Sequence, residues 1–322
     1  MKIFLLRRFL SIIPLLLAIT LITHVLLYLA PGDYFSKLEE DPTITAEQLA
    51  RLRQEFGLDG GVLYRYWKWL GNAVTGNFGY SFDNRIPVFD LVMERLGNTF
   101  LLALSSLVFS WGLAIPLGIF AAVYRNKLID KFASVVSFLG LSIPSVFFAL
   151  LMVLFAHLTG WFPTGGIHNQ IDWDDYNWFQ RFTDTLHHLI LPTIVLGTIG
   201  MAQYMRQMRG SMVETLSQDY IRTAKAKGLS FRQVLINHGL GNAINPLITL
   251  FGFSLAYLLN GSFLVEIVMS WPGMARLTVS ALFSQDEPLV MASVVMSSVM
   301  LIAGNLMADI MLAIVDPRIR LD

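Results

Sequence analysis

The amino-acid sequence predicts an all-α membrane protein that crosses the bilayer six times. Hydrophobic residues make up 55% of the 322 residues, charged residues make up only 14%, and the mean hydropathy is +0.58. Several apolar runs reach the roughly 20 residues that a helix needs to cross the hydrocarbon core. The predicted spans are residues 9–30, 98–123, 132–158, 186–205, 240–265 and 288–315.

The first span follows a short basic N-terminus. Lys2, Arg7 and Arg8 precede the apolar run 9–30, an arrangement that signal peptides and first transmembrane helices share. The run is longer than the roughly 7–15 apolar residues of a signal peptide, and no small-x-small cleavage site follows it. We therefore predict that residues 1–30 are a cytoplasmic N-terminus and an uncleaved first span; a signal peptide that is removed is the alternative.

Residues 31–97 form the predicted outer segment, and they contain signals for short helices. Thr45 and Gln48 have the spacing of a capping box. The stretch VLYRYWKWL (62–70) predicts an aromatic helix. Pro87 suits the start of a third helix that leads into the second span.

The basic residues of the short loops predict the orientation, because cytoplasmic loops carry the excess of Lys and Arg. With both termini in the cytoplasm, the short outer loops contain only Arg181 and Arg276. The outer segment 31–97 does not alter this, because long loops cross largely regardless of charge. The basic residues on the cytoplasmic side are then Lys2, Arg7, Arg8, Arg125, Lys127, Lys131, Arg206, Arg209, Arg222, Lys225, Lys227, Arg232, Arg318 and Arg320.

Tryptophans gather in the predicted outer segments. An aromatic belt at the membrane interface has this pattern, and a docking surface for an external partner is the alternative. The tryptophans concerned are Trp67, Trp69, Trp161, Trp173, Trp178 and Trp271.

Prolines interrupt five of the six predicted spans. Proline removes a backbone N–H group and bends a helix, so we expect kinked helices, as in a bundle that opens and closes. Ordinary tolerance of proline in membrane helices is the alternative. The residues are Pro14, Pro116, Pro144, Pro192 and Pro246.

The five-span core, residues 98–322, contains one polar loop at 206–239. Its six basic residues would cost on the order of 15–20 kcal/mol at the bilayer centre, so the loop is cytoplasmic. Ser217 is positioned to cap a helix that starts near Gln218. Gly228 then suits a left-handed position at the end of that helix.

A second helix is predicted to start just after this turn. Ser230 and Gln233 form a capping box, and the helix should continue into the fifth span. The short first helix would approach another surface closely through its small residues, and it suits insertion into a groove of a partner. A basic loop that binds anionic lipid is the alternative.

The loop also resembles a known family. The stretch YIRTAKAKGLS followed by NHGLGNAINPLI is similar to the cytoplasmic loop of permease subunits of binding-protein-dependent ABC importers, closest to the peptide/nickel branch. The resemblance covers nearly the whole chain. It also includes RRFLSIIPLLLAIT, LAPGD (29–33), GNFGYSF (76–82), ERLGNTFLLAL (94–104), SIPSVFFAL (142–150), SWPGMARL (270–277) and DPRIR (316–320).

This resemblance implies the fold of the type I ABC importer transmembrane domain and a helix that docks on a cytoplasmic ATPase. The chain departs from the broad family pattern at Arg222 and Thr223, where glutamate and alanine are usual, and at Leu240–Gly241, where a leucine-proline pair is usual. The coupling helix would consist of Asp219, Tyr220, Ile221, Arg222, Thr223, Ala224, Lys225 and Ala226, followed by Gly228.

The same resemblance implies the function and the partners. The chain would form half of a pathway for di- or oligopeptides in a bacterial or archaeal inner membrane. Its partners would be a second homologous permease subunit, two ABC ATPase subunits that use ATP and Mg²⁺, and an external substrate-binding protein. Nickel complexes, glutathione or a peptide antibiotic are alternative substrates.

Motifs for other chemistry are absent from the sequence. No G-x-x-x-x-G-K-[ST] motif occurs, so we expect no ATP hydrolysis by this chain. There are no cysteines and no H-E-x-x-H motif, so we expect no metal or cofactor. The zero net charge does not favour nucleic acid as a partner.

Two other classes of protein rank below the importer. A secondary transporter usually has inverted repeats and ionisable residues at mid-membrane, and neither is evident. A membrane hydrolase needs a nucleophile beside a base, but Ser142 and His157 of the third span would lie ~22 Å apart.

Six polar residues in the predicted spans are candidates for a translocation pathway or gate. Ionisable residues inside a membrane are candidates for function by default, and a structural role near the span ends is the alternative. Glu266 is favoured as an outer gate, because SWPG follows it and ends the helix. The others are Asn242, Asn245 and Asn260 in the fifth span and Asn305 and Asp309 in the sixth.

Overall fold

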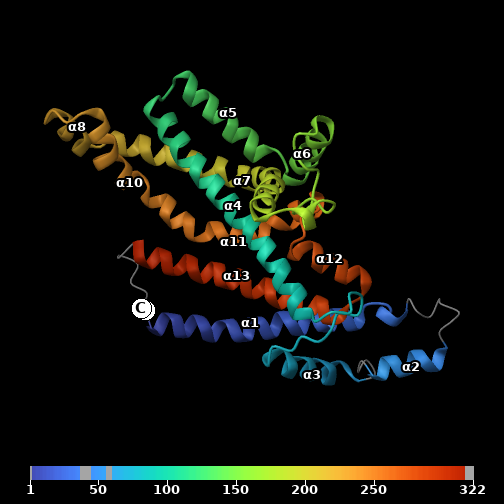
Figure 1. Cartoon of the computed structure of the whole chain (residues 1–322). Helices are drawn as coiled ribbons and strands as arrows, with labels where there is room; N and C mark the ends of the chain where they lie inside the picture. Colours follow the sequence, from blue (N-terminus) through green and yellow to red (C-terminus); the bar gives the residue numbers. More distant parts are fainter. Residues whose placement is uncertain (1, 37–44, 56–59, 316–322) are drawn as a thin grey trace. The chain divides into compact units, whose positions relative to one another are not determined.

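The chain is built almost entirely of helices (Figure 1). The computed structural model describes residues 2–36, 45–55 and 60–315. These residues form no β-strand, only an isolated bridge between Tyr80 and Pro87. The helices are α1 (Lys2–Leu29), α2 (Ala46–Glu55), α3 (Val62–Val74), α4 (Val88–Val123), α5 (Leu128–Ser142), α6 (Ser145–Thr159), the 3₁₀ turn η2 (Trp173–Asp175), α7 (Trp178–Leu216), α8 (Asp219–Ala226), α9 (Phe231–Gln233), the π-helix η3 (Val234–Leu240), α10 (Gly241–Ala243), α11 (Asn245–Val268), α12 (Met274–Ser284) and α13 (Glu287–Val315).

Long apolar helices confirm an all-α membrane protein. Among the described residues, four segments are long and apolar enough to cross a bilayer, and α5 with α6 passes the same test as a bent pair. Helix α11 has 24 residues, about 36 Å, which also exceeds the ~30 Å hydrocarbon core. The total of six membrane spans stays a prediction. The four segments are Leu10–Ser36, Val88–Val123, Trp178–Leu216 and Glu287–Met307.

Two helices extend well beyond the predicted spans. Helix α4 begins at Val88 rather than at residue 98, and α7 runs from Trp178 to Leu216 rather than over 186–205. With 39 residues, α7 is about 58 Å long and outreaches even the headgroup regions. The apolar run marks only the part of a helix that lies in lipid, because charged residues outside the membrane continue the same backbone hydrogen bonds. The first part of the predicted loop 206–239 is therefore helical.

The predicted third span is broken at Pro144. Helices α5 and α6 meet at an angle of 104°. Ile143 is extended, with φ −84° and ψ 121°, because the ring of the following proline disfavours helical backbone at the residue before it. Residues 132–158 thus belong to two helices rather than to one kinked helix, and the expected proline bend is present.

The other prolines behave differently. Pro14, Pro116 and Pro192 lie inside continuous helices. Pro246 lies in the first turn of α11 rather than in its interior, a position where the missing N–H group costs nothing.

The described residues divide into two compact units. The first contains the described residues up to Asn98 and Pro272–Ile302. Within it α3 is fixed to α1: the Tyr66 hydroxyl lies 2.9 Å from Thr20 Oγ1. The carboxylate of Glu287, at the start of α13, contacts both Arg65 of α3 and the buried His24 of α1.

The helix signals of the outer segment are confirmed. The Thr45 N–H donates to Gln48 Oε1 at 2.9 Å and the Gln48 N–H donates to Thr45 Oγ1 at 3.3 Å. Residues 62–70 lie within α3, and α4 starts directly after Pro87.

A buried carboxylate, Asp286, ties the loop before α4 to the start of α13. It accepts hydrogen bonds from the Ser81 hydroxyl at 2.5 Å and from the N–H groups of Asp83 and Leu289 at 3.2 Å. Burial raises the pKa of Asp286, and these hydrogen bonds oppose that rise. The residue lies just before the last span.

The second unit contains Thr99–Trp271 and the described residues from Ala303 to Val315. Helix α7 is at its centre and packs on α5, α6 and α11 (Figure 1). Met205, Met208 and Met212 of α7 are buried. A Cβ atom at Gly118 of α4 would lie 2.7 Å from the Met208 Cβ atom, so the glycine allows α4 and α7 to approach closely.

The tryptophans of the predicted outer segments do not share one environment. Trp67, Trp161 and Trp178 are exposed, which suits the membrane interface or a partner. Trp271 is fully buried and is a core residue instead.

Candidate functional site

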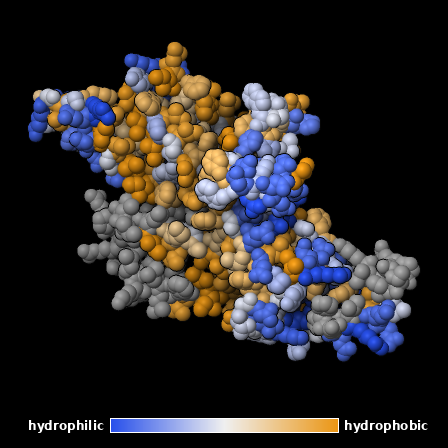
Figure 2. All heavy atoms as spheres, viewed as in Figure 1, coloured by the Kyte–Doolittle hydropathy of each residue, from blue (hydrophilic) through white to orange (hydrophobic). Residues whose placement is uncertain are grey.

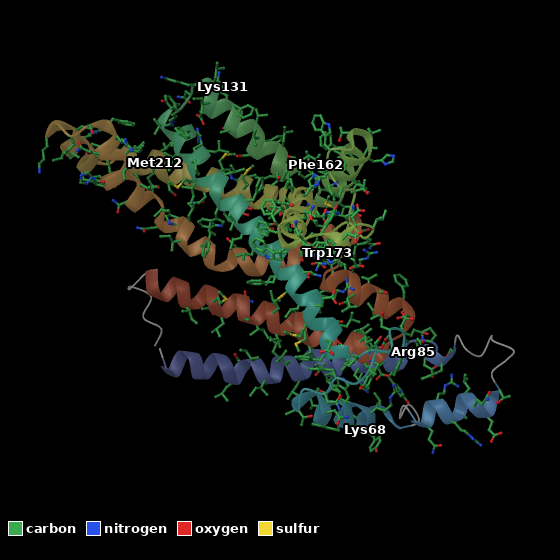
Figure 3. The ribbon with its side chains drawn as sticks, in the orientation of Figure 1. Lys68, Arg85, Lys131, Phe162, Trp173 and Met212 are labelled. Carbon is green, nitrogen blue, oxygen red and sulfur yellow. The ribbon has the colours of Figure 1, made fainter. Side chains whose placement is uncertain are left out.

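Helix α8 lies at one end of the second unit (Figure 1). Figure 3 shows Lys131 and Met212 toward this end, whereas Phe162 and Trp173 lie at the opposite end. The connections between α4 and α5 and between α7 and α9 therefore share one end of the unit. The predicted orientation requires both of these basic connections to lie on the cytoplasmic side, and their shared end agrees with this.

A narrow apolar stripe on α8 packs against η3, which follows α8 in the chain. Ile221 is 0% exposed and packs with Ala224 and with Val234 of η3. Arg222, Thr223 and Lys225 are exposed. Figure 2 shows hydrophilic residues gathered at this tip of the unit. The short helix thus has one buried apolar face, which packs against η3, and one polar face that is exposed.

The end of α8 is the predicted left-handed turn. Gly228 has φ +81°, and the N–H groups of Lys227 and Gly228 donate to the Thr223 and Lys225 carbonyls at 3.0 Å. A Cβ atom at Gly228 would meet no atom within 4 Å. The glycine is needed for its backbone conformation and not for space.

The predicted cap at the start of α8 was wrong. The residue before the helix is Gln218, and it makes no side-chain capping bond. The Ser217 hydroxyl instead donates to the Glu214 carbonyl at 2.6 Å, because α7 continues to Leu216 and leaves carbonyls unpaired at its end. Asp219 in the first turn still stabilises the start of α8 through the helix dipole.

The predicted helix after the turn is present, with an unpredicted π-helical segment. The Ser230 N–H donates to Gln233 Oε1 at 3.0 Å and the Gln233 N–H donates to Ser230 Oγ at 3.4 Å, which completes the capping box. The chain then passes through η3 and α10 into α11. A π-helix of seven residues is rare, and no sequence signal indicated it.

Asn242, a predicted pathway residue, contacts α8. Its amide donates to the Tyr220 hydroxyl at 3.0 Å and to the His238 carbonyl at 3.2 Å. This bond joins α8 to α10. The sequence analysis named Tyr220 as a coupling residue and Asn242 as a pathway residue, but it did not predict that they contact each other.

Glu266 is the most deeply buried of the candidate gate residues whose side chains the structure describes. Its side chain is 0% exposed near the end of α11. The hydroxyl of the buried Thr99 donates to Glu266 Oε1 at 2.7 Å, which joins α4 to α11. Sequence reasoning missed Thr99; the polar pair Asn98–Thr99 ahead of an apolar run was the available signal.

The remaining candidates differ from Glu266 in their burial or in their place along the helices. Asn245 is exposed at the opposite end of α11, about 31 Å along the helix from Glu266. Asn305 and Asp309 are half-buried in α13. The side chain of Asn260 lies outside the described residues. No group of three His, Asp or Glu that could hold a metal occurs in the described part of the chain.

An ion pair that sequence reasoning missed fixes the start of α5 to α7. Arg209 Nη2 donates to Asp130 Oδ2 at 2.9 Å, and the same carboxylate accepts from the Asn126 N–H at 2.9 Å. Asp130 is buried. Asp130 is next in sequence to Lys131, which lies toward the end of the unit that carries α8 (Figure 3).

Similar proteins of known function cover the whole length of the chain. The oligopeptide transport system permease protein AppB of Bacillus subtilis (strain 168) is 42% identical over 321 residues, with 99% of each chain covered. The dipeptide transport system permease protein DppB of Escherichia coli (strain K12) is 35% identical, with 98% of each chain covered. The glutathione transport system permease protein GsiC of the same strain is 34% identical, again with 98% covered.

A solved structure supports the fold. An inward-facing form of the MetNI methionine ABC transporter matches with a TM-score of 0.55 at 16% sequence identity, over 70% of this chain and 96% of that chain. At this identity the match speaks for the fold alone.

Family matches cover nearly all residues. Residues 1–103 match the N-terminal component family of binding-protein-dependent transport systems, and residues 114–321 match the main family of inner membrane components. The chain belongs to the family of binding-protein-dependent transport system inner membrane components.

Proposed function

We propose that this chain is the permease subunit of an ATP-driven importer of di- and oligopeptides. It would form half of the translocation pathway, and a second homologous permease subunit would form the other half. The observation that carries the proposal is the similarity over the full length to the peptide permeases AppB and DppB. The family itself disfavours the secondary transporter, since its members depend on a binding protein.

Helix α8 is the proposed contact with the ATPase. The coupling residues are Asp219–Ala226 with Gly228. An eight-residue helix with a buried base, a polar outer face and a fixed end suits a groove in a partner. Its bond through Tyr220 to Asn242 offers a direct mechanical link from α8 toward α11.

ATP and Mg²⁺ belong to the partner subunits in this proposal. Two ABC ATPases would bind ATP with Mg²⁺ and move α8 during hydrolysis, and this chain would bind no cofactor. The N- and C-termini, the α4–α5 connection and α8 would face the cytoplasm of a bacterial or archaeal cell. The shared end of Lys131 and Met212 in Figure 3 supports this orientation, because cytoplasmic segments carry the basic residues.

An external binding protein would deliver the peptide to the opposite side. The connection between α6 and α7 is the proposed contact of the second unit, because it lies at the other end from α8 (Figure 3). Glu266 with Thr99 is the proposed outer gate, since their buried bond holds α4 against α11 at that end. Asn242, Asn245, Asn260, Asn305 and Asp309 remain proposed pathway positions.

Glutathione is the specific alternative substrate, because GsiC is 34% identical over the full length. Uptake of labelled dipeptide, oligopeptide and glutathione by cells that express the complete system would decide between them. Peptide uptake that stops on ATP depletion and persists without a proton gradient supports the proposal. Uptake that follows the proton gradient and survives ATP depletion contradicts it.

Purification from native membranes tests the partners. A tagged chain in mild detergent should bring along at least two other protein species, a homologous permease and at least one ABC ATPase, identified by mass spectrometry. Recovery of the folded, active chain alone would contradict the proposed assembly.

A further inference from the structure

A groove runs between α5 and α7, on the side of the second unit where both helices carry basic residues. Its volume is about 270 Å³. The residues that line it are Ala133, Ser134, Ser137, Phe138, Leu141, Met205, Arg206 and Arg209. None of these residues belongs to the proposed coupling helix or gate.

The groove is polar at one end and apolar at the other. Helices α5 and α7 run antiparallel, because Asp130 pairs with Arg209 while Gly140 packs against Ala202. Arg206 and Arg209 therefore lie beside the start of α5, and Leu141 lies deeper, near the break at Pro144. A ligand with a charged head and an apolar body fits this gradient.

The length of the gradient matches one leaflet of a bilayer. From Lys131 to Leu141 the helix rises about 15 Å, which is half of the ~30 Å hydrocarbon core. Phe138 is exposed on the rim of the groove, as expected of a side chain that faces lipid. The basic end therefore lies at headgroup depth.

The charge at the basic end is available to an anion. Arg209 is engaged by Asp130, so the pair contributes little net charge. Arg206 is exposed and has no ion-pair partner among the described residues. Lys131, one turn before Ser134, adds a second exposed cation at the same end (Figure 3).

We propose that this groove binds an anionic phospholipid of the cytoplasmic leaflet, with its phosphate at Arg206 and an acyl chain along Phe138 and Leu141. Basic pockets between helices on the cytoplasmic side are suited to such headgroups. The Ser134 and Ser137 hydroxyls can donate to the headgroup or the ester oxygens. The assignment rests on the proposed orientation, because anionic lipids are enriched in that leaflet.

Native mass spectrometry of the purified importer complex tests the site. The probes are phosphatidylglycerol and phosphatidylcholine with identical oleoyl chains. One cation near a headgroup corresponds to about a fivefold difference in affinity. We expect phosphatidylglycerol to bind at least about fivefold more tightly to the wild type, and Arg206→Gln to lower that preference by about fivefold.

Two further variants separate the groove from general charge. Arg232→Gln removes an exposed cation of the same side outside the groove and should keep the preference. Ser134→Trp fills the groove without changing charge and should weaken binding of phosphatidylglycerol. Equal binding of the two lipids by the wild type, or an unchanged preference in Arg206→Gln or Ser134→Trp, would overturn the proposal. The readout is binding, so its failure would leave the importer assignment intact.

Discussion

The hydroxyl of Thr99 donates a hydrogen bond to Glu266 across 167 positions of sequence, at a distance of 2.7 Å, and both side chains are buried. The bond fixes α4 to the end of α11. A buried carboxylate that loses a hydrogen-bond donor loses part of what offsets its desolvation cost. We therefore expect the hydrogen bond between Thr99 and Glu266 to affect the stability of the protein as well as gating.

Thr99→Val should destabilise the protein, because it keeps the side-chain shape and removes the donor to Glu266. We expect a loss of about 1–3 kcal/mol, measured by thermal unfolding of the purified complex. Thr99→Ser keeps the hydroxyl and is the matched control. Equal unfolding temperatures for the valine and serine variants would show that the bond contributes nothing.

Gly228 should be irreplaceable for transport by any residue that avoids left-handed backbone. With φ +81°, Gly228→Val places a β-branched side chain where it is strongly disfavoured. Gly228→Asn is the control, because asparagine tolerates this conformation. We expect normal membrane insertion of both variants, with peptide uptake lost in the valine variant and largely kept in the asparagine variant. Normal uptake by Gly228→Val would contradict a fixed end for α8.

The pH dependence of stability should carry a contribution from Asp286. Burial raises its pKa above the ordinary value of 3.8. As pH rises through 3.8, the Asp286 carboxyl ionises in the unfolded chain while it stays protonated in the folded protein. Ionisation therefore favours the unfolded state until the pH also exceeds the pKa of the folded state. Stability should therefore fall as pH rises through the interval just above 3.8.

Unfolding measured at a series of pH values checks this contribution. Asp286→Asn should remove the fall, whereas Asp83→Asn, at an exposed neighbour, should leave it in place. A fall of the same size in the Asp286→Asn variant would assign the effect to another group.

The ion pair between Asp130 and Arg209 should couple α5 to α7. Asp130→Asn or Arg209→Gln should each cost about 1–2 kcal/mol, since the carboxylate is buried while the guanidinium stays partly hydrated. A double-mutant cycle of thermal unfolding isolates the pair. Strictly additive effects of the two substitutions would show that the observed contact carries no energy.

Local signals in the sequence predicted local structure well. The capping box at Ser230 and the turn at Gly228 depend on residues within one or two helical turns, so their chemistry is visible in the chain itself. The cap at Ser217 failed because the end of α7 was placed too early. Hydropathy marks the lipid-embedded part of a helix and says nothing about how far the helix continues into water.

Contacts between distant residues were beyond the reach of the sequence. Asp130 and Arg209 are 79 positions apart, and Thr99 and Glu266 are 167 apart. Nothing in one sequence selects these partners among many polar residues. The buried state of Glu266 likewise depends on how α4 packs on α11, which no hydropathy pattern reports.

The most direct test of the account is a cross-link from the outer face of α8. The chain has no cysteine, so Thr223→Cys provides a single site for a benzophenone maleimide in native membranes. Arg51→Cys, on the exposed face of α2, is the matched control. The account predicts a light-dependent adduct between the chain and an ABC ATPase from Thr223→Cys and none from Arg51→Cys. Normal peptide uptake with no ATPase adduct from Thr223→Cys would contradict the assignment of α8 as the coupling helix.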